Sequence, residues 1–345
     1  MKSEYDVIII GAGPAGLSCA IELQSSEKTV LILEKNKKIG PKVCAGGLTT
    51  KIESLGLFLD MADILFSSIK MNVPGRIKIV SSNKPFVATI DRSKFGNILL
   101  EKLSKKIKVK IDLEIDKVDK IDENFIEIKG QKIKYKYLVG ADGSNSIVRR
   151  FLGLENKKFL IALQYIIPQK FKQLELFFDV DLFGLGYAWI FPHKDYTSVG
   201  CVSNVNFVKT HKLKNNFERW LINQNIKIRE SKLESGIINF DYQGFKFGNK
   251  FLVGDAAGFA SGLTGEGIFF GMVSGQEVAK KNIDPVYKCK EISKILEIKH
   301  AHERIFNFML LLMSINKSLP NFCFRFFFFL FNFKWFTKKA LKLHS

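Results

Sequence analysis

A short apolar run that ends in a glycine-rich turn constrains the fold of this chain more than any other segment. Residues 5–10 (Tyr-Asp-Val-Ile-Ile-Ile) have the continuous apolar character of a strand buried in a parallel sheet, and residues 11–16 follow with the spacing Gly-x-Gly-x-x-Gly. A helix is predicted over residues 14–25 and a second buried strand over residues 29–33. This order of strand, glycine turn, helix and strand predicts a βαβ unit that binds a dinucleotide.

The three glycines and a downstream acid have separate tasks in such a unit. Gly11 allows the tight turn, Gly13 lets the backbone approach a pyrophosphate, and Gly16 lets helix and strand pack closely. The helix N-terminus then presents free N–H groups and partial positive charge to the phosphates. Glu34 lies 18 residues after Gly16, at the end of the second strand, where a carboxylate accepts from a ribose hydroxyl. An acid at this position favours FAD or NAD over NADP.

Three later segments decide between these two cofactors. Residues 140–143 (Gly-Ala-Asp-Gly) and 254–258 (Gly-Asp-Ala-Ala-Gly) both follow apolar strands. Asp255 is expected where its strand ends, so its carboxylate can hold a polyol hydroxyl such as the ribityl chain of a flavin. Residues 262–267 (Gly-Leu-Thr-Gly-Glu-Gly) form a loop that enters a helix, and its N–H groups can stabilise negative charge on a reduced flavin.

Together these segments resemble the FAD-dependent p-hydroxybenzoate-hydroxylase-like superfamily, over roughly residues 5–50, 90–150 and 250–280. The resemblance implies FAD as the cofactor, with Asp142 near its pyrophosphate and Asp255 on its ribityl chain.

Arg92 also corresponds to an arginine that lies near FAD in that superfamily. From the residues alone, Arg92 is equally a solvated residue that opens a helix, and Asp142 a turn residue that supports its own backbone. The cofactor-binding residues predicted from motif and resemblance are Gly11, Gly13, Ala15, Gly16, Glu34, Lys35, Cys44, Ala45, Arg92, Asp142, Asp255, Gly265, Gly267 and Ile268.

Two further segments narrow the resemblance. Residues 42–48 (Lys-Val-Cys-Ala-Gly-Gly-Leu) follow the βαβ unit, and residues 187–192 have the pattern Tyr-x-Trp-x-Phe-Pro. With residues 263–268 they resemble the geranylgeranyl reductase family. That family reduces isolated carbon–carbon double bonds of prenyl chains, including those of isoprenoid lipids and the chlorophyll tail. The resemblance therefore implies an enzyme that acts on CH–CH groups of a prenyl-lipid substrate.

The chemistry of alkene reduction makes Cys44, Tyr187 and Trp189 the candidate catalytic residues. Such a reaction needs a hydride, a proton delivered from elsewhere, and a dry apolar channel. Tyr187 and Trp189 share one side of a strand and can form an aromatic wall; the alternative is an ordinary core pair. Gly46 and Gly47 permit close backbone passage, so Cys44 can serve as proton donor or redox-sensitive gate; the alternative is a small residue that fills space.

Competing functions remain open at this stage. A flavin-dependent monooxygenase or halogenase is one alternative. Halogenases of the superfamily carry Trp-x-Trp-x-Ile-Pro, and Tyr187 and Phe191 depart from that pattern, which weakens the halogenase interpretation. An electron-carrying flavoprotein linked to membrane quinones is weakened because the five cysteines are dispersed and contain no Cys-x-x-Cys pair. The same dispersal argues against a metal site or a disulfide framework and favours a reducing compartment. With no second Gly-x-Gly-x-x-Gly, the reductant is NAD(P)H, ferredoxin or a quinol.

Two polar residues beside these motifs receive structural roles. Glu266 is predicted to complement a helix dipole, and His193, directly after Pro192, is predicted to be a turn residue.

The predicted fold class is α/β: a Rossmann-type FAD-binding domain interleaved with an antiparallel-sheet substrate domain, followed by a helical C-terminal tail. The FAD-binding domain is assigned to residues 1–65, 90–155 and 245–282, the substrate domain to residues 66–89 and 156–244, and the tail to residues 283–345.

Charge and the apolar tail bear on location and partners. The chain has 345 residues with 53 Lys and Arg against 34 Asp and Glu, a net charge of +19, but the basic residues are dispersed, which argues against nucleic acid. Residues 305–315 are too short to span a bilayer, and residues 322–336 are rich in Phe with Arg325 and Lys334 among them. We expect a cytoplasmic protein whose tail lies in a membrane interface; the alternative is an apolar helix packed on the FAD-binding domain. The sequence does not indicate an oligomeric state.

Overall fold

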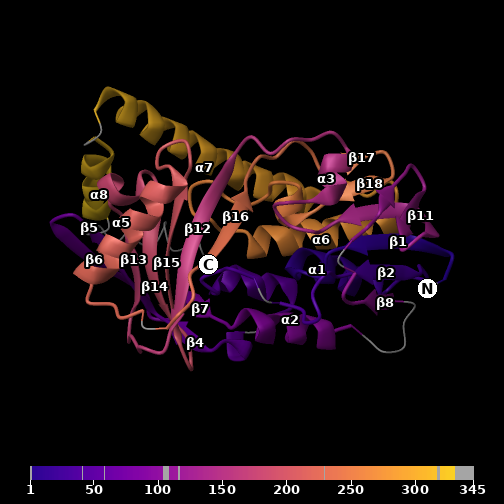
Figure 1. Cartoon of the computed structure of the whole chain (residues 1–345), viewed down its shortest axis with the longest axis horizontal. Coiled ribbons are helices and arrows are strands. Elements are labelled where there is room, and N and C mark those ends of the chain that lie inside the picture. The colour runs from indigo at the N-terminus through magenta and orange to yellow at the C-terminus, as the bar shows by residue number, and fades with distance from the viewer. Residues whose placement is uncertain are drawn as a thin grey trace.

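Two large sheets lie side by side in the molecule, and helices cover both (Figure 1). The computed structural model describes residues 2–40, 42–57, 59–103, 109–115, 117–228, 230–316 and 319–330. A long helix, α7 (Lys290–Ile315), runs from one half of the molecule to the other (Figure 1). The predicted α/β class, with a Rossmann-type sheet, an antiparallel sheet and a helical C-terminal part, is confirmed.

The first sheet has a parallel core centred on β1 (Glu4–Ile10). Ile8 pairs with Leu31 on one side and with Leu138 on the other, and both neighbouring strands run parallel to β1. The strand order is β17-β18-β11-β1-β2-β8, with β10 and β9 added beside β11. These strands are β2 (Val30–Leu33), β8 (Val109–Asp112), β9 (Lys120–Ile121), β10 (Phe125–Ile128), β11 (Gln131–Gly140), β17 (Lys246–Phe247) and β18 (Lys250–Leu252).

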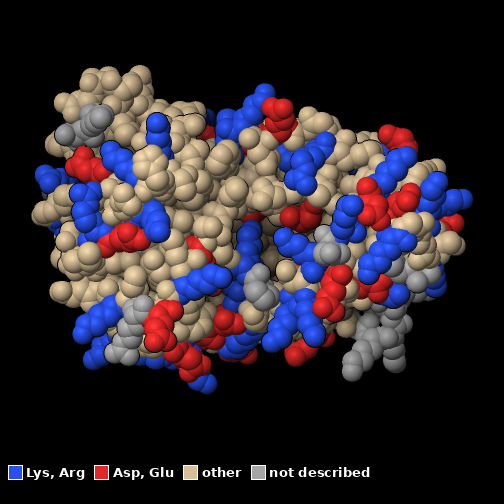
Figure 2. Space-filling view, in the orientation of Figure 1, with Lys and Arg blue, Asp and Glu red and all other residues tan. Residues whose placement is uncertain are grey.

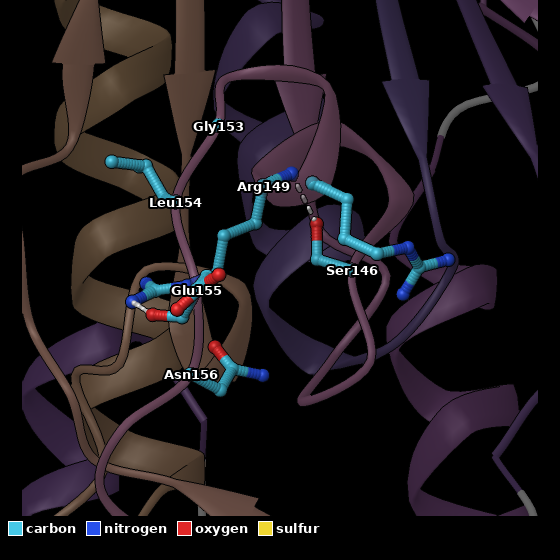
Figure 3. A pocket seen from close by; sticks show the side chains of 7 residues that line it. Ser146, Arg149, Gly153, Leu154, Glu155 and Asn156 are labelled. Carbon is cyan, nitrogen blue, oxygen red and sulfur yellow. Dashed lines mark hydrogen bonds between the residues drawn. The ribbon is translucent and has the colours of Figure 1, made fainter.

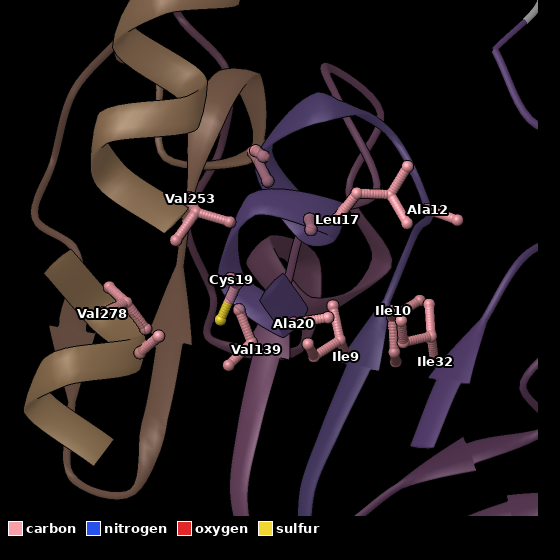
Figure 4. Packing of buried hydrophobic residues seen from close by; sticks show 14 of the residues in the cluster. Ile9, Ile10, Ala12, Leu17, Cys19, Ala20, Ile32, Val139, Val253 and Val278 are labelled. Atoms are coloured by element: carbon pink, nitrogen blue, oxygen red, sulfur yellow. The ribbon is translucent and has the colours of Figure 1, made fainter. Parts of the chain in front are cut away.

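Helices α1 (Pro14–Leu23) and α6 (Ile268–Ile283) cross closely over this sheet. Small residues make the approach possible, because a Cβ added at Gly275 would lie 2.2 Å from the carbonyl oxygen of Ala15. The apolar side chains of β1, α1 and α6 interdigitate in one buried cluster (Figure 4). The continuous apolar run of β1 therefore lies in a packed core, and this core fixes the glycine turn between β1 and α1.

The second sheet is antiparallel except where β13 and β5 run parallel. Its order is β16-β12-β15-β14-β13-β5-β6. The strands are β5 (Ser68–Val73), β6 (Arg76–Ser81), β12 (Phe159–Ile167), β13 (Leu174–Phe177), β14 (Tyr187–Pro192), β15 (Thr197–Asn204) and β16 (Glu234–Asn239). One face packs on α5 (Thr210–Asn223) and α4 (Val180–Phe183).

Smaller elements join the two sheets. A three-stranded sheet has the order β3-β7-β4, with β3 (Gly47–Thr49), β4 (Ile64–Phe66) and β7 (Val87–Thr89). The 3-10 helices are η1 (Thr50–Leu55), η2 (Leu59–Met61) and η3 (Gly254–Ala256), and the short helices are α2 (Arg92–Glu101) and α3 (Ile147–Phe151). Strands of the two large sheets alternate along the chain, in keeping with interleaved domains; the residue boundaries given above stay a prediction.

The C-terminal part packs on both halves of the molecule. Ile292 and Ile295, in the first half of α7, are buried in the core of the FAD-binding half, and the second half of α7 and α8 pack on the antiparallel half. Phe306 and Met309 of α7 are buried beside Leu185. Helix α8 (Leu319–Leu330) packs near β5, and the guanidinium of Arg325 donates to the carbonyl of Pro74 at 2.7 Å. None of the helices in the described ranges is long and apolar enough to cross a membrane. The expected run beyond residue 330, with Lys334, lies outside the described residues.

Candidate functional site

The glycine turn between β1 and α1 leaves an open space at the start of the helix. Gly11 has φ +104°, and a Cβ there would lie 2.4 Å from the carbonyl oxygen of Ala141. Gly16 is equally confined, since its Cβ would lie 2.0 Å from the Gly11 carbonyl oxygen. Around Gly13, by contrast, a Cβ would meet no described atom within 4 Å, and no side chain caps α1. The uncapped helix N-terminus, where Ala15 is the second residue of the first turn, thus faces a space suited to an anion.

Glu34 anchors the far edge of this turn. Its Oε2 accepts from the Ala12 N–H at 2.9 Å, and its Oε1 accepts from the backbone and side-chain nitrogens of Asn36 at 2.9 and 2.8 Å. A carboxylate has about four acceptor positions, so these bonds leave capacity for a ribose hydroxyl. Lys35, next along the chain, is exposed. The assignment of both residues to the cofactor stays a prediction.

Several buried side chains of the described residues have a polar atom without a hydrogen-bond partner, and two of them, Arg92 and Asp142, were predicted to lie near FAD. The Nε and Nη1 of Arg92 and the Oδ1 of Asp142 are buried without a hydrogen-bond partner among the described residues. Burial raises the pKa of Asp142, whose other oxygen accepts from the Ile147 N–H at 2.6 Å. Unpaired buried charges are costly, and a bound group that contacts them removes the cost. The residues present therefore fit a phosphate-containing cofactor such as FAD.

The position of Arg92 corrects one alternative drawn from the sequence. Arg92 opens α2 behind the N-cap Asp91, as a helix-opening residue would, but it is only 8% exposed rather than solvated. One oxygen of Asp142 supports its own turn, as the local alternative predicted, and the other is unpartnered among the described residues; its place at the pyrophosphate stays a prediction.

Asp255 gathers segments that lie far apart in the sequence. It follows β18 in η3, and its Oδ2 accepts from Lys42 Nζ at 2.7 Å and from Ser144 Oγ at 3.3 Å. Its carbonyl oxygen accepts from Asn239 Nδ2 at 2.8 Å. The loop after the βαβ unit and the segment after the Gly-Ala-Asp-Gly turn thus converge on the carboxylate of Asp255, and the end of β16 binds its backbone carbonyl. Sequence reasoning missed Lys42 and Ser144 as partners, although Lys42 stands within a quoted motif and Ser144 directly follows another.

The loop before α6 meets the predicted aromatic strand. The Tyr187 hydroxyl donates to the carbonyl of Thr264 at 2.6 Å and would lie 3.2 Å from a Cβ at Gly265, whose φ is +68°. Burial raises the pKa of Tyr187, so its hydroxyl stays neutral. Gly267 precedes Ile268, the first residue of α6, and no side chain caps that helix.

Glu266, in the same loop, is a second carboxyl group near this end of α6. Burial raises its pKa, and its Oε1 lies 3.5 Å from Thr49 Oγ1. A raised pKa favours the neutral carboxyl group, which can donate a hydrogen bond. The predicted role, compensation of the helix dipole, does not require such a donor.

The loop that contains Cys44 packs on the same face as Tyr187 and Trp189. Tyr187, Trp189 and Phe191 point to one side of β14, and Ala45 packs in their cluster. A Cβ at Gly47 would lie 2.6 Å from the Phe191 ring.

Two details define this aromatic face. The rings of Tyr187 and Trp189 have centroids 6.3 Å apart, and the Trp189 indole donates to Ser198 Oγ at 3.1 Å. The predicted alternation along the strand is therefore present. Trp189 is buried in a hydrophobic cluster with Tyr187 and Ala45 packed against it, and the assignment of these rings to a substrate wall stays a prediction.

One open cavity lies apart from these residues. Its volume is about 480 Å³, and it is lined by Ser146, Arg149, Arg150, Gly153, Leu154, Glu155 and Asn156 (Figure 3). Arg149 is buried behind it and donates to the carbonyls of Ala256, Glu155 and Asp241. These bonds give Arg149 a structural role, and none of the predicted site residues lines the cavity.

A FAD-dependent oxidoreductase is the class of protein that this fold and site define, and residues 5–170 match the pyridine nucleotide-disulphide oxidoreductase family. An uncharacterized protein of Methanosarcina barkeri is 31% identical over 294 residues, which cover 80% of this chain and 74% of that protein. A digeranylgeranylglycerophospholipid reductase of Methanococcus vannielii is 26% identical, with 81% and 78% covered.

Solved structures share the fold. A geranylgeranyl bacteriochlorophyll reductase-like protein from Thermoplasma acidophilum has a TM-score of 0.72 at 22% identity, with 86% of this chain and 83% of that chain covered. The flavin-dependent brominase Bmp2 has a TM-score of 0.72 at 19% identity, with 99% and 93% covered. The chain belongs to the geranylgeranyl reductase family of FAD-dependent oxidoreductases, as the sequence resemblance predicted.

Proposed function

We propose that this protein reduces carbon–carbon double bonds in the prenyl chain of an isoprenoid lipid. The observation that carries the proposal is the apolar face of Tyr187, Trp189 and Phe191, which packs against the loop of Cys44. An aromatic wall beside a thiol suits an apolar chain that must be kept dry while a proton is delivered. The archaeal relative named as a digeranylgeranylglycerophospholipid reductase supports this substrate class.

The residues divide the chemistry between them. Bound FAD supplies a hydride to one alkene carbon when it is reduced. The other carbon needs a proton, and the Cys44 thiol is our candidate donor, to be reprotonated afterwards from solvent. Tyr187 is a poorer donor, because its single O–H is already given to Thr264. We assign Tyr187 and Trp189 to the wall of the prenyl channel, where they exclude water.

The test is an anaerobic reaction of the reduced, FAD-loaded protein. We expect faster flavin reoxidation with a digeranylgeranyl lipid than with oxygen, and a product that has gained two hydrogens for each double bond lost. Cys44→Ser should slow the lipid-dependent reaction, whereas Cys323→Ser, a second half-buried cysteine in α8, should not. Flavin reoxidation that oxygen alone accelerates, with no saturated lipid, would overturn the proposal.

Oxygen chemistry is the second candidate, because the brominase shares the fold. The same experiment separates it: hydroxylated or halogenated product under air would favour a monooxygenase or halogenase. Reduction of a quinone without lipid saturation would favour an electron carrier. The reductant, whether NAD(P)H, ferredoxin or a quinol, is best identified by which of the three reduces the bound flavin.

We also propose that the outer face of α7 rests on a lipid bilayer. Ile305, Phe308, Leu311 and Ile315 project outward and are 50, 57, 59 and 69% exposed, while Phe306 and Met309 on the opposite face dock on the protein. Arg304 is exposed beside this stripe. In Figure 2 the upper-left corner, where Figure 1 has the end of α7, is tan, and blue and red atoms lie below it. An apolar stripe with a flanking cation, on a protein of net charge +19, suits an anionic membrane interface.

Vesicle flotation tests this contact. Phe308→Glu with Leu311→Glu should lower binding to anionic phosphatidylglycerol vesicles by more than about tenfold, because two buried apolar side chains are lost from the interface. Ile222→Glu, 73% exposed on α5, is the matched control and should leave binding unchanged. Equal flotation of all three proteins would remove the stripe from the proposal.

A further inference from the structure

His193 opens the turn between β14 and β15, as the sequence predicted, since its N–H donates to the Tyr196 carbonyl at 2.8 Å, and its side chain is also a buried link between two loops. It follows β14 directly and is 2% exposed. Its Nδ1 lies 3.1 Å from Asp63 Oδ2, and its Nε2 lies 3.0 Å from the carbonyl oxygen of Ala45. The ring stacks on Tyr196 with centroids 4.4 Å apart. Both ring nitrogens are therefore engaged inside the protein.

Both partners of the His193 ring are hydrogen-bond acceptors. A backbone carbonyl can only accept, so Nε2 must carry a proton if this contact is a hydrogen bond. Asp63 is ionised: burial opposes its charge, but hydrogen bonds from His193, Lys94 and the Asp91 N–H outweigh burial and lower its pKa. An ionised carboxylate also only accepts, so Nδ1 must carry a proton as well. Two protonated nitrogens make the ring an imidazolium.

The charges that surround the ring agree with this state. Asp63 and Asp91 face the cluster with Lys94, which donates to Asp63 Oδ1 at 3.0 Å, so these three groups sum to −1 and a cation at His193 neutralises them. Tyr196 donates to Asp91 Oδ2 at 3.0 Å, and burial followed by the neighbouring Asp91 raises its pKa, so Tyr196 stays neutral.

The carbonyl that His193 holds belongs to a tightly confined turn. Gly46 has φ +75°, and a Cβ there would lie 2.6 Å from His193 Cε1 and 2.6 Å from the Ile90 carbonyl oxygen. The Ile90 N–H donates to the Gly46 carbonyl at 2.9 Å, and the Gly46 N–H lies 3.4 Å from Cys44 Sγ. The imidazole and β7's exit at Ile90 thus clamp the turn that carries the thiol.

We propose that His193 is a positioning residue, held as an imidazolium by Asp63, which fixes the Ala45 carbonyl and through it the Cys44 thiol. Loss of one ring proton as the pH rises leaves only one of the two acceptors satisfied. The carboxylate is the stronger acceptor, so the bond to Ala45 is the one released. The positioning role of His193 follows from contacts within this chain. Its effect on turnover rests on the proposed function of Cys44.

The first test is the protonation state, read by nitrogen-15 NMR of the histidines in the full-length protein. We expect protonated shifts at both ring nitrogens of His193 near neutral pH. In Asp63→Asn the ring should show one bare nitrogen at the same pH, because the carboxylate charge that holds the second proton is gone. A His193 ring with one bare nitrogen at neutral pH in the wild-type protein would overturn the imidazolium.

The second test is the reactivity of Cys44, measured by peptide-resolved alkylation with iodoacetamide. His193→Gln removes the charge-assisted hydrogen bond to Asp63. The Cys44 loop should then open more often, and Cys44 alkylation should be about tenfold faster, as expected from the loss of one such bond. His211→Gln, at an exposed histidine on α5, is the control. Equal alkylation rates in the two variants would overturn the positioning role. Should His193→Gln not fold, the NMR comparison with Asp63→Asn still decides the charge.

These readouts need no substrate, so they separate this inference from the proposed function. If the protein shows both results but saturates no prenyl chain, the positioning role of His193 is supported and the proposed reaction is overturned. If the reaction is confirmed, lipid reduction should be slower in Asp63→Asn than in the wild-type protein, because the support of the Cys44 loop is weakened.

Discussion

The site has a nucleotide half, around the glycine turn of residues 11–16, and an aromatic half, around Tyr187 and Trp189 on β14. Backbone atoms form the first half and side chains form the second. Around the glycine turn the backbone forms the site: Gly11 and Gly16 let main-chain atoms approach, and the N-terminus of α1 is left open. On the antiparallel sheet side chains form the site, because Trp189 packs against the Cys44 loop and His193 bridges Asp63 and Ala45. A backbone site needs residues close in sequence, whereas a side-chain site can be assembled from any segments that the fold brings together.

The largest effect should come from the backbone half. Gly11→Ala places a Cβ against the Ala141 carbonyl at a left-handed φ, so we expect loss of FAD binding and a fall of about 3 kcal/mol or more in the free energy of unfolding. Gly13→Ala is the matched control: it meets no described atom, so the stability of the FAD-free protein should change by less than about 1 kcal/mol. Its FAD affinity should still fall, measured by fluorescence titration. Equal destabilisation by both substitutions would break the distinction.

Arg92 should separate cofactor binding from stability. Arg92→Met removes a buried guanidinium with unpartnered nitrogens, so FAD affinity should fall by about tenfold to a hundredfold as charged hydrogen bonds are lost. The melting temperature of the FAD-free protein should stay the same or rise, because an unpaired buried charge is gone. Arg150→Met, at an exposed arginine of α3, should change neither quantity. A less stable FAD-free Arg92→Met protein would mean that Arg92 has a structural partner instead.

One carboxylate in each half offers a comparison by pH. Burial opposes the ionisation of Asp6, but bonds from Lys136 and Thr29 outweigh it and lower its pKa to about 2. The pKa of Asp63 is also lowered from 3.8, by bonds that outweigh burial. A lowered folded pKa stabilises the protein above the unfolded value, and this contribution is lost as the pH falls through the folded value.

Asp6→Asn and Asp63→Asn should therefore both be less stable than the wild-type protein at pH 7, by thermal melting. The difference should narrow as the pH falls from about 4 toward the folded pKa of each group. Only Asp63→Asn should also alter the NMR titration of His193. A stability difference that persists unchanged at acidic pH would show that the ionised carboxylates are not its cause.

The smallest effect should come from the hydroxyl that joins the halves. Tyr187→Phe removes the bond to the Thr264 carbonyl, so the free energy of unfolding should fall by about 1 kcal/mol. Flavin reoxidation by prenyl lipid should slow with it, because the loop before α6 loses a support. Tyr165→Phe, on the opposite face of the same sheet, is the control and should leave the lipid reaction unchanged. Equal lipid turnover in both variants would assign Tyr187 to packing alone.

Prediction from the sequence reached the fold class, the cofactor and the residues of the glycine turn because their signals are local. The alternation of Tyr187 and Trp189 was also predictable, since neighbouring positions on a strand point to opposite faces. The burial of Arg92 was not, because a helix-opening arginine has the same local pattern whether it faces solvent or a cofactor site.

The sequence by itself determined the βαβ unit and its affinity for a dinucleotide, because a left-handed glycine, a tight turn and an uncapped helix start are properties of a few adjacent residues. Only the tertiary structure decided which side chains meet on the aromatic half. His193 lies 130 residues from Asp63 and 148 from Ala45, and no local spacing relates them. Their meeting depends on how β14, the small three-stranded sheet and the Cys44 loop pack. When these segments pack, they bury the His193 ring between two hydrogen-bond acceptors. The proposed charge on the ring depends on this burial, which no single segment creates.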